Sequence, residues 1–549
     1  MKRTKLSFLI VFALLFMAPS AAQATASGPS AEARTAGYLD TIRAKRAKLR
    51  AFLKAMPKGA DLHNHLSGAV PTETLIRYAV NDRLCIDTTT FTATPAPAAT
   101  GGPCPTGQRP VADSNTDPAF FAQIVRAWSM QGFQPGTESS HDHFFATFGK
   151  FGLATSRKGD MLAKVTNINA RQHVLYLETL VSRQGDAVRA LAEKVGFDPS
   201  FAALRRRLLE GGLPAMVAAA SADTDADLTR YKHLLRCGTP RAEPGCAMVV
   251  RYDYQVSRAT KPEIVFTNLL LGFELQRRDP RYVGVNLVQP EDDPVALRDY
   301  TLQMRMIQYL RTVYPSAHVT LHAGEIVSGL VPAADLRSHI RQAVEIAGAE
   351  RIGHGVDVAG EISGGQLLAE MARRHVLVEV PLTSNAQILG VFGAAHPFVN
   401  YRDAGVPVAL ATDDAGVERI DLTHEYQLAT TQYRLDYSDL KTLSRASLEH
   451  AFLPGASLWR SRDNYRLARA CAADRPGQRS PGRACRALLR HSTKALTEWK
   501  LERAFRAFEQ HWRGREKRPK AADVRHRINA RPVGVMATQP LARPALLRS

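Results

Sequence analysis

His63 and His65 stand one residue apart near the start of the chain, in MPKGADLHNHLSGAV (residues 56–70). Alternate residues of an extended strand point to the same side, so both imidazoles can reach one metal ion. Pairs of this spacing also arise by chance, and SHDHFF contains a second one, His141 and His143. The rest of the chain must decide which pair binds a metal, if either does.

Further polar residues follow other apolar, β-branched runs of the chain. They are His322 and Glu325 in HVTLHAGE, His354 in ERIGHG, and Asp413 and Asp414 in VPVALATDD. Three imidazoles and one carboxylate suit Zn²⁺ and leave a position for a bound water. The residues that offer this set are His63, His65, His322 and Asp413. A single His or Asp at a strand end is usually a satisfied polar group, but four in this arrangement favour a metal site.

The second histidine pair fails the same test. His141 and His143 follow no predicted strand and lead into HFFATFGKF, which has the character of a helix start. We interpret this pair as a capping element or as part of a pocket edge.

Eight strand candidates alternate with helical stretches along the chain. They span residues 59–65, 173–182, 248–257, 282–290, 318–325, 350–355, 376–385 and 406–414. Alternation of this kind predicts an α/β fold with a parallel sheet, and eight units predict a (β/α)8 TIM-type barrel. The alternative is a doubly wound open sheet, which normally carries an early glycine-rich phosphate turn that this chain lacks. In a barrel, catalytic groups come from the carboxyl ends of the strands, where these polar residues stand.

Two absences narrow the class of metal site. The fourth strand candidate, YVGVNLVQP, contains no lysine that could bridge two metal ions, so one ion per chain is favoured. The His-x-Glu and Pro-Cys-x-x-Cys signature of cytidine-type deaminases is also missing.

The sequence predicts a precursor with several segments. Residues 1–24 have the basic start, short apolar run and small-residue cleavage site of a signal peptide, so the mature chain is expected to begin near Thr25 or Ser27 and to be periplasmic or secreted. A helical extension is predicted at 25–55 and the barrel at 56–512, with a Pro/Gly/Thr-rich insertion at about 85–135. No later apolar run has the length of a transmembrane helix.

The six cysteines fall in three sequence-local groups. They are Cys85 and Cys104, Cys237 and Cys246, and Cys471 and Cys485. Export makes disulfides possible, and six cysteines allow fifteen connectivities in principle. Short loops cost least to close, so pairing between neighbours is expected.

The net charge of +20 is concentrated in part at the C-terminus. Residues 513–549 carry ten Lys or Arg against Glu516 and Asp523 and show no amphipathic period, so they are predicted to be a disordered basic tail. No stacking motif or recognition helix accompanies the charge, and a specific nucleic-acid partner is not expected.

As an ordered set, the motifs MPKGADLHNHLSGA, LHAGE, RIGHG, VPLTSN and ATDD resemble those of the adenosine deaminase family. The resemblance runs from about Met56 to Leu453, excluding the insertion, and the signal peptide and HDHFF are similar to its secreted bacterial branch. It implies a (β/α)8 barrel with one zinc ion. The reaction it implies is attack of zinc-bound hydroxide on purine C6, which converts adenosine or 2'-deoxyadenosine to inosine and ammonia.

The resemblance also assigns roles to residues of this chain. It makes His63, His65, His322 and Asp413 the zinc ligands. Glu325 would protonate purine N1, and His354 would orient and deprotonate the zinc-bound water. Asp414 would hydrogen-bond the attacking water or purine N7.

Two positions depart from the family pattern and concern substrate binding. Ser67 stands where the family has an Asp that contacts ribose, and Gln289 stands where it has a Gly whose backbone contacts purine N3. Phe144, Phe145 and Phe148 could form an apolar wall for the ring or be ordinary core residues. The alternatives are therefore an aminohydrolase for another adenine-containing substrate, or a secreted binding or signalling protein without activity.

Overall fold

The computed structural model of this chain describes residues 29–95, 102–134 and 136–512. The predicted signal peptide and the predicted basic tail lie outside the described residues. So does a short part of the predicted insertion, residues 96–101.

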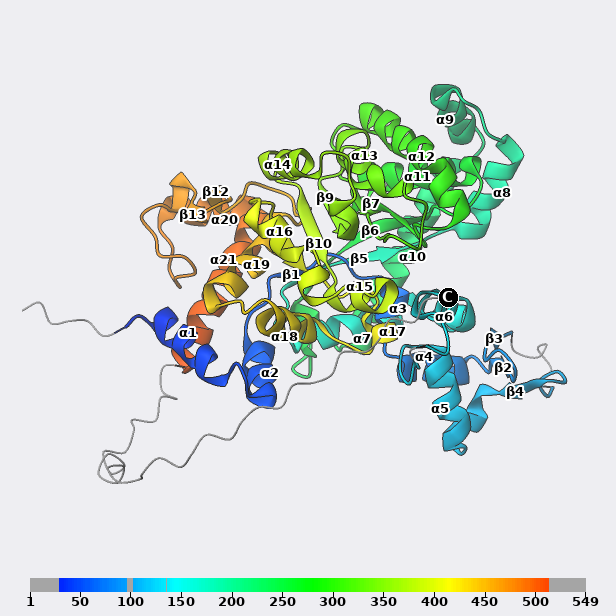
Figure 1. Ribbon diagram of the computed structural model, residues 1–549, viewed down its shortest axis with the longest axis horizontal. Coiled ribbons are helices and arrows are strands. Elements are labelled where there is room, and N and C mark those ends of the chain that lie inside the picture. The colour runs from blue at the N-terminus through cyan, green and yellow to red at the C-terminus, as the bar shows by residue number, and fades with distance from the viewer. Residues whose placement is uncertain (1–28, 96–101, 135, 513–549) are drawn as a thin grey trace, which may run out of the picture.

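Eight parallel strands form the centre of the molecule (Figure 1). They are β1 (Ala60–Asp61), β5 (Tyr176–Val181), β6 (Val249–Ser257), β7 (Tyr282–Val288), β8 (Thr320–Ala323), β9 (Arg351–His354), β10 (Leu377–Val380) and β11 (Val408–Leu410). Each lies inside one of the eight predicted strand segments. All residues of β5, β7, β8, β9 and β10 are buried, as expected for parallel strands that are covered on both faces.

Hydrogen bonds join these strands into two four-stranded parallel sheets, β1-β5-β6-β7 and β11-β10-β9-β8. One parallel bridge connects Val285 of β7 to Val319 before β8, and another connects Asn64 after β1 to Asp413 after β11. The α/β class is confirmed, and the strands follow one another in the cyclic order expected of a barrel. Each junction between the sheets is a single bridge rather than a ladder, partly because β1 is hydrogen-bonded over only two residues.

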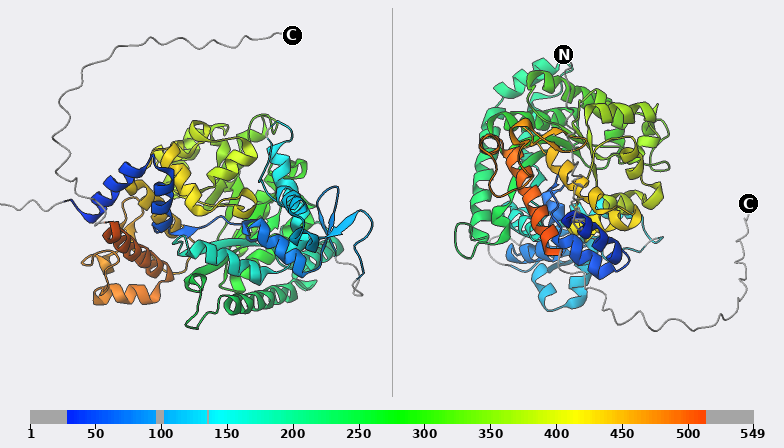
Figure 2. Two further views of the ribbon diagram at one scale, coloured as in Figure 1. Left: turned by 90° about the horizontal axis from the view of Figure 1, so that it is seen from below. Right: turned by 90° about the vertical axis from the view of Figure 1, so that its left-hand side faces the viewer.

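The strands alternate with helices, most of which cover the outer side of the two sheets (Figures 1 and 2). They are α3 (Leu66–Ala69), α4 (Thr72–Asn81), α8 (Gly185–Val195), α9 (Phe201–Glu210), α10 (Leu213–Leu234), α11 (Pro262–Arg278), α12 (Pro294–Val313), α13 (His339–Glu345), α14 (Gly364–Arg374), α15 (Leu382–Leu389), α16 (Phe398–Asp403), α17 (Ala415–Glu418), α18 (Leu422–Gln432) and α19 (Tyr437–Glu449). Their starts use familiar signals. For example, Asp293 caps α12 by accepting from the backbone N–H of Val295, and Pro294 is its first residue.

Further elements lie before, between and after these units. Two helices open the described chain, α1 (Ala31–Ile42) and α2 (Arg46–Ala55). The segment between α4 and β5 contains β2 (Cys85–Asp87), β3 (Ala93–Thr94), β4 (Gln108–Pro110), α5 (Pro118–Ala127), α6 (Ser140–Phe151) and α7 (Lys158–Ala170). The last described elements are β12 (Trp459–Ser461), β13 (Arg466–Leu467), α20 (Arg483–His491) and α21 (Thr493–Trp512). The β2–β4 hairpins and α5 project away from the strands (Figure 1). Helix α21 packs against α1, so the two ends of the described chain meet.

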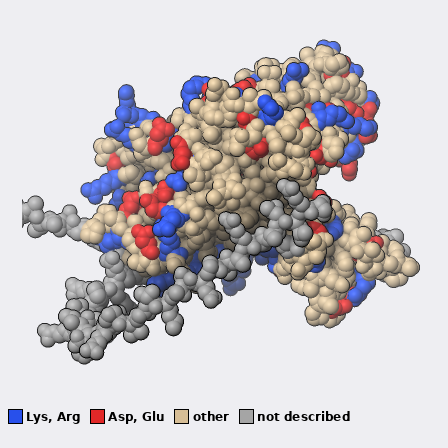
Figure 3. Space-filling view, viewed as in Figure 1, with Lys and Arg blue, Asp and Glu red and all other residues tan. Residues whose placement is uncertain are grey.

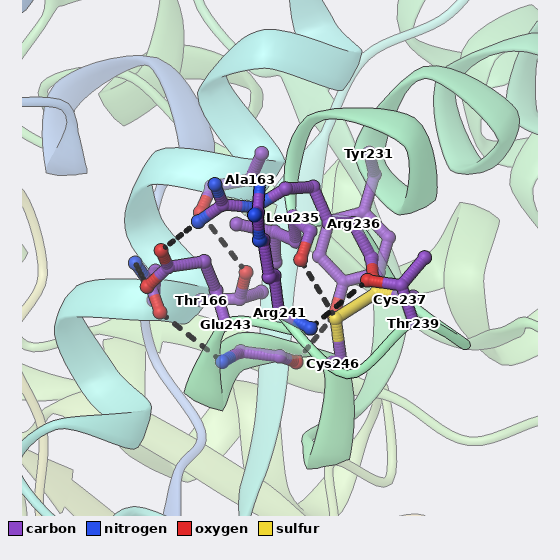
Figure 4. The surroundings of a disulfide bond; sticks show 12 residues. Ala163, Thr166, Tyr231, Leu235, Arg236, Cys237, Thr239, Arg241, Glu243 and Cys246 are labelled. Atoms are coloured by element: carbon purple, nitrogen blue, oxygen red, sulfur yellow. Dashed lines mark hydrogen bonds and ion pairs between the residues drawn. A yellow bond between two sulfur atoms is a disulfide. The ribbon is translucent and has the colours of Figure 1, made fainter.

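The cysteines pair with their sequence neighbours, as expected. Disulfides join Cys85 to Cys104, Cys237 to Cys246, and Cys471 to Cys485. Figure 4 shows the second, where the chain turns between α10 and β6 and Tyr231 donates to the carbonyl of Gly245. The third belongs to a small apolar cluster that is separate from the main core and contains Trp459 and Trp499.

The charge of the described residues is mixed. Lys and Arg alternate with Asp and Glu over the face seen in Figure 3 rather than forming one basic field. No helix in the described part of the chain has both the length and the apolar character that are needed to cross a membrane.

Candidate active site and metal centre

Three histidines and one aspartate converge where β1, β8 and β11 end. His63 Nε2 lies 3.0 Å from His322 Nε2, and His65 Nε2 lies 3.2 Å from the same atom. Asp413 Oδ1 is 3.5 Å from His63 Nε2 and 3.2 Å from His65 Nε2. All four side chains are buried. The structure thus brings the four predicted ligands together. Atoms of His63, His322 and Asp413 lie within 4.8 Å of one another and of His354, whereas His65 forms such a group with Asp413 and Asp414.

The outer nitrogen of each of these imidazoles has an acceptor. His63 Nδ1 faces Glu379 Oε2 at 2.9 Å, and a carboxylate of this kind only accepts. His322 Nδ1 faces Asn286 Oδ1 at 2.8 Å, and the same oxygen accepts the backbone N–H of His322. His65 Nδ1 faces Gln255 Oε1 at 3.1 Å. Protons on the three Nδ1 atoms leave three bare Nε2 lone pairs facing one another. A cation relieves this arrangement, so the donor set fits a metal ion.

The electrostatics of the cluster point the same way. Burial lowers the pKa of His63, but Asp413 and Glu379 outweigh burial and hold it well above its ordinary value. For Asp413, burial raises the pKa, and the hydrogen bonds and charges of His63 and His65 more than reverse this and hold it well below the ordinary value. Positive charge is therefore stabilised at this point. Zinc and protons compete for the histidine nitrogens at this point, because histidine ligands must be neutral.

The backbone places Asp413 and the neighbouring His354 by adopting a conformation that side chains disfavour. Asp413 has φ 54° and His354 has φ 68°. Left-handed backbone at a non-glycine residue costs about 1–3 kcal/mol and persists where the surroundings impose it, often at functional sites. The hydrogen-bonded part of β1 ends at Asp61, and His63 and His65 lie just beyond it, where single bridges at Asn64 and His65 hold the chain.

Glu325 lies beside this cluster with its carboxyl group buried. Its Oε1 is 3.6 Å from His354 Nε2. Burial raises its pKa well above the ordinary value, and Asp413 and Glu291 raise it further. Burial thus favours the protonated form of Glu325, which is the form that a general acid needs.

The turn that carries Glu325 is held by a second glutamate. Glu291 accepts the backbone N–H groups of Gly324 and Glu325 at 3.1 and 2.9 Å. His339 Nδ1 lies 2.6 Å from Glu291 Oε1, and its ring stacks on Tyr300 with 3.7 Å between ring centres. The position of Glu325 is thus fixed from the β7–α12 loop.

Asp414 contacts the same space from the next residue along the chain. Its Oδ1 is buried and has no hydrogen-bond partner among the described residues. A Cβ atom on Gly68 would lie 1.7 Å from this oxygen, so Gly68 must be glycine for Asp414 to keep its place. Burial raises the pKa of Asp414 well above its ordinary value, Asp413 raises it further, and His65 acts against the shift.

A cavity of about 500 Å³ opens in front of these groups, a size that suits a small organic molecule. It is lined by all the predicted substrate-binding residues, which are Ser67, Gln289, Asp414, Phe144, Phe145 and Phe148. Phe145 and Phe148 are partly exposed, whereas Phe144 is almost fully buried. Gln289 has φ 83°, the conformation of a glycine, and its Oε1 accepts the backbone N–H of Ala259 at 3.0 Å. No Lys or Arg is among the described residues that line the cavity.

The second histidine pair does not form a site. His141 and His143 lie in the first turn of α6, as the helix prediction required. His141 Nε2 contacts Asp292 at 3.0 Å, whereas His143 contacts Glu138 and the carbonyl of Ser129. Their rings bond to different partners, and His141 links α6 to the loop after β7.

Sequence reasoning missed the residues that orient the predicted ones. They are Glu379, Asn286, Gln255, Asn385 and Glu291. Glu379 had a signal, because a lone acid in the apolar run VLVEV must point into a buried space. The amides had none, since only the pairing of the strands brings them to a histidine.

Comparison with known proteins matches part of this chain to adenosine deaminases. The adenosine deaminase family model matches residues 235–461, less than half of the chain. An adenosine deaminase of Escherichia coli (strain SE11) is 38% identical over 137 residues, which cover 25% of this chain and 38% of that protein. An adenosine deaminase of Escherichia coli O1:K1 / APEC gives the same values. The chain thus spans well under half the length of these curated relatives.

Solved structures from Arabidopsis are also similar. The ADAL protein complexed with IMP has a TM-score of 0.46 and 19% identity, and the match covers 73% of this chain and 93% of that one. The N6-mAMP deaminase MAPDA has a TM-score of 0.46 and 20% identity, with 74% and 96% covered.

Proposed function

We propose that this chain is a member of the adenosine deaminase family, built on a closed (β/α)8 barrel, and that it deaminates adenosine or 2'-deoxyadenosine hydrolytically with one bound Zn²⁺. One observation carries the proposal: three imidazole Nε2 atoms and Asp413 converge beside Glu325, whose pKa burial raises, in a ligand-sized cavity. The family match over residues 235–461, which contain His322, Glu325, His354 and Asp413, supports it.

The residues present can each take a defined part in this reaction. His63, His65, His322 and Asp413 would hold the zinc ion, which supplies an acidified water for attack at purine C6. Glu325, whose protonated form burial favours, would donate its proton to purine N1 and make C6 more electrophilic. Asp414 has a buried oxygen without a partner among the described residues, which can accept a hydrogen bond from the attacking water. In its protonated form, which burial favours, Asp414 can donate a hydrogen bond to purine N7.

The lining of the cavity favours an uncharged nucleoside over a nucleotide. The aromatic side chains of α6 offer apolar surface to the purine ring, and Ser67 and Gln289 can hydrogen-bond a sugar. A phosphate group usually requires Arg or Lys, and none of the described lining residues provides one. We therefore expect adenosine to be preferred over AMP.

A substrate panel combined with metal analysis tests the proposal. Purified protein should contain about one zinc per chain and release ammonia from adenosine or 2'-deoxyadenosine. Adenine, AMP and N6-methyl-AMP complete the panel, and Glu325→Gln prepared in parallel excludes a contaminating activity. Faster turnover of AMP would reverse the substrate assignment. A zinc-loaded protein that is inert toward every adenine compound would favour a binding or signalling role.

We also propose that the protein is exported after cleavage of residues 1–24. The three disulfides support this, because such bonds persist in oxidising compartments. Intact mass under non-reducing conditions should give a chain that begins at Thr25 or Ser27 and contains no free thiols. A full-length chain with alkylatable cysteines would contradict export.

A further inference from the structure

A line of three buried side chains runs from the active site to the start of α16. His354 Nδ1 lies 2.8 Å from the end of the Asn385 amide that is placed as Oδ1. The other end, placed as Nδ2, lies 2.8 Å from Nε2 of His396. Nδ1 of His396 lies 3.0 Å from the backbone nitrogen of Phe398. His354 and Asn385 are fully buried and His396 is 3% exposed, so water cannot replace any of these contacts.

The backbone end of this line fixes the proton of His396. An N–H group can only donate, so Phe398 requires a bare Nδ1 on His396. A doubly protonated His396 would place its Nδ1–H against the N–H of Phe398, so the imidazolium form is excluded. Burial, reinforced by the charge of His354, lowers the pKa of His396 to about 4, which agrees with a neutral ring. A neutral ring with a bare Nδ1 carries its proton on Nε2.

The proton on His396 in turn fixes the amide of Asn385. Nε2–H of His396 donates, so the group of Asn385 that faces it must be the amide oxygen. The amide is therefore turned by about 180° from its placement above, because the N–H of Phe398 and the NH2 group of Asn385 cannot both donate to a neutral His396. The NH2 group of Asn385 then faces Nδ1 of His354 and donates to it. This is the one amide orientation that gives every donor an acceptor along the line, and the hydrogen-bond network is what assigns such orientations. Nδ1 of His354 is therefore an acceptor.

We propose that His396 and Asn385 are positioning residues that hold His354 in its Nε2-protonated tautomer, so that its free N–H donates a hydrogen bond into the active site. His354 Nε2 is buried with no hydrogen-bond partner among the described residues. It lies 3.6 Å from both Glu325 Oε1 and Asp413 Oδ2. The N–H is thus aimed at the space where the attacking water must stand.

The tautomer changes the role of His354 in the proposed reaction. The resemblance assigns it removal of a proton from the water, but an occupied Nε2 has no lone pair for that proton. His354 instead orients the attacking oxygen and stabilises negative charge on it, and the proton of the water goes to Asp414, whose Oδ1 is buried without a partner among the described residues. This consequence rests on the proposed function, whereas the tautomer itself does not.

Nitrogen-15 spectra of the histidine rings test the tautomer directly. In zinc-loaded protein labelled with ¹⁵N-histidine, the signals that vanish in His354→Gln identify this ring. We expect its Nε2 to be protonated and its Nδ1 bare. Asn385→Asp should reverse this, because a carboxylate accepts only and draws the proton to Nδ1. A protonated Nδ1 in the wild-type protein would overturn the proposal.

Kinetics of the same variants test the consequence. Asn385→Asp is nearly isosteric, so packing should survive, and His396→Ala removes the group that fixes the amide. Each should lower kcat by about 10–100-fold with stoichiometric zinc retained and KM little changed. His233→Gln, at an exposed position on α10, is the matched control and should keep wild-type kcat. Unchanged kcat in both site variants would remove the catalytic role. An inactive wild-type protein with the expected tautomer would instead reject the proposed deaminase function.

Discussion

Two buried clusters of ionisable side chains share one carboxylate, Glu379, yet they differ in where their cation comes from. On one side, Glu379 Oε1 is 2.6 Å from Nε of Arg351. That guanidinium also lies 2.6 Å from Glu178 and 3.1 Å from Asp253, and it stacks at 3.8 Å on the ring of Phe452. On the other side, Glu379 Oε2 bonds to Nδ1 of His63, whose Nε2 enters the group of facing lone pairs.

The difference separates structural charge from functional charge. Arg351 is fully buried and supplies its own positive charge to three carboxylates, which raise its pKa although burial acts in the opposite direction. The histidine cluster has comparable burial and short contacts but no permanent cation, because its histidines must be neutral to bind a metal. An arrangement that is complete without a ligand serves the fold, whereas one that is complete only with an added cation serves binding.

The largest effect should come from removing a ligand. His322→Ala deletes one of the converging nitrogens, and we expect zinc to be lost together with at least about 10³-fold in activity, since the metal contributes several kcal/mol. Zinc should raise the melting temperature of the wild-type protein but not of the variant, because only a bound ion stabilises the folded state. Stoichiometric zinc in His322→Ala would show that the histidine cluster is not the metal site and would remove the contrast with the Arg351 cluster.

Removing the built-in cation should instead damage the fold. Arg351→Met leaves Glu178, Asp253 and Glu379 buried without their partner, which costs about 3–5 kcal/mol. Urea unfolding of the metal-free protein measures this loss in the free energy of unfolding. Arg373→Met is the control, because Arg373 pairs with Glu370 while 71% exposed, and such pairs contribute less than about 1 kcal/mol. Equal midpoints for the two variants would show that the Arg351 cluster is not structural.

The sequence predicted one of these clusters and missed the other. His63, His65, His322 and Asp413 were recognisable because metal ligands are rare residue types and each follows an apolar run. Arg351 starts its strand and Asp253 lies in the middle of its own. From sequence alone, a charged residue at such a position is taken to indicate a strand edge or the protein surface. Their meeting depends on the register of β6, β9 and β10, and on β9 and β6 facing each other from different sheets. Local patterns carry no information about that.

Replacing Glu325 should cost a free energy close in size to that of replacing Arg351, but it should change the reaction rate and not the stability of the fold. Glu325→Gln keeps the shape of the side chain and cannot deliver a proton to purine N1. We expect kcat to fall at least about 10²-fold, or about 2.7 kcal/mol, with KM changed much less. Zinc content and the urea midpoint serve as controls and should match the wild-type protein. Near-normal kcat would remove Glu325 from the role of acid.

The smallest effect, and the sharpest test of the comparison, concerns the carboxylate that the two clusters share. In Glu379→Gln, the amide oxygen can still accept from Arg351, and the amide NH2 then faces Nδ1 of His63. Two donors would oppose each other, so the His63 proton must move to Nε2, where zinc requires a lone pair. We expect zinc affinity to fall by about 10–100-fold, or about 1.4–2.7 kcal/mol, in competition with a chelator. Thr320→Val is the matched control: it removes only a 3.1 Å hydrogen bond to Glu379 Oε1, leaves the contact with His63 intact, and should keep zinc affinity within about twofold. Wild-type affinity in Glu379→Gln would mean that the carboxylate belongs to the Arg351 cluster alone and that His63 keeps its tautomer without it.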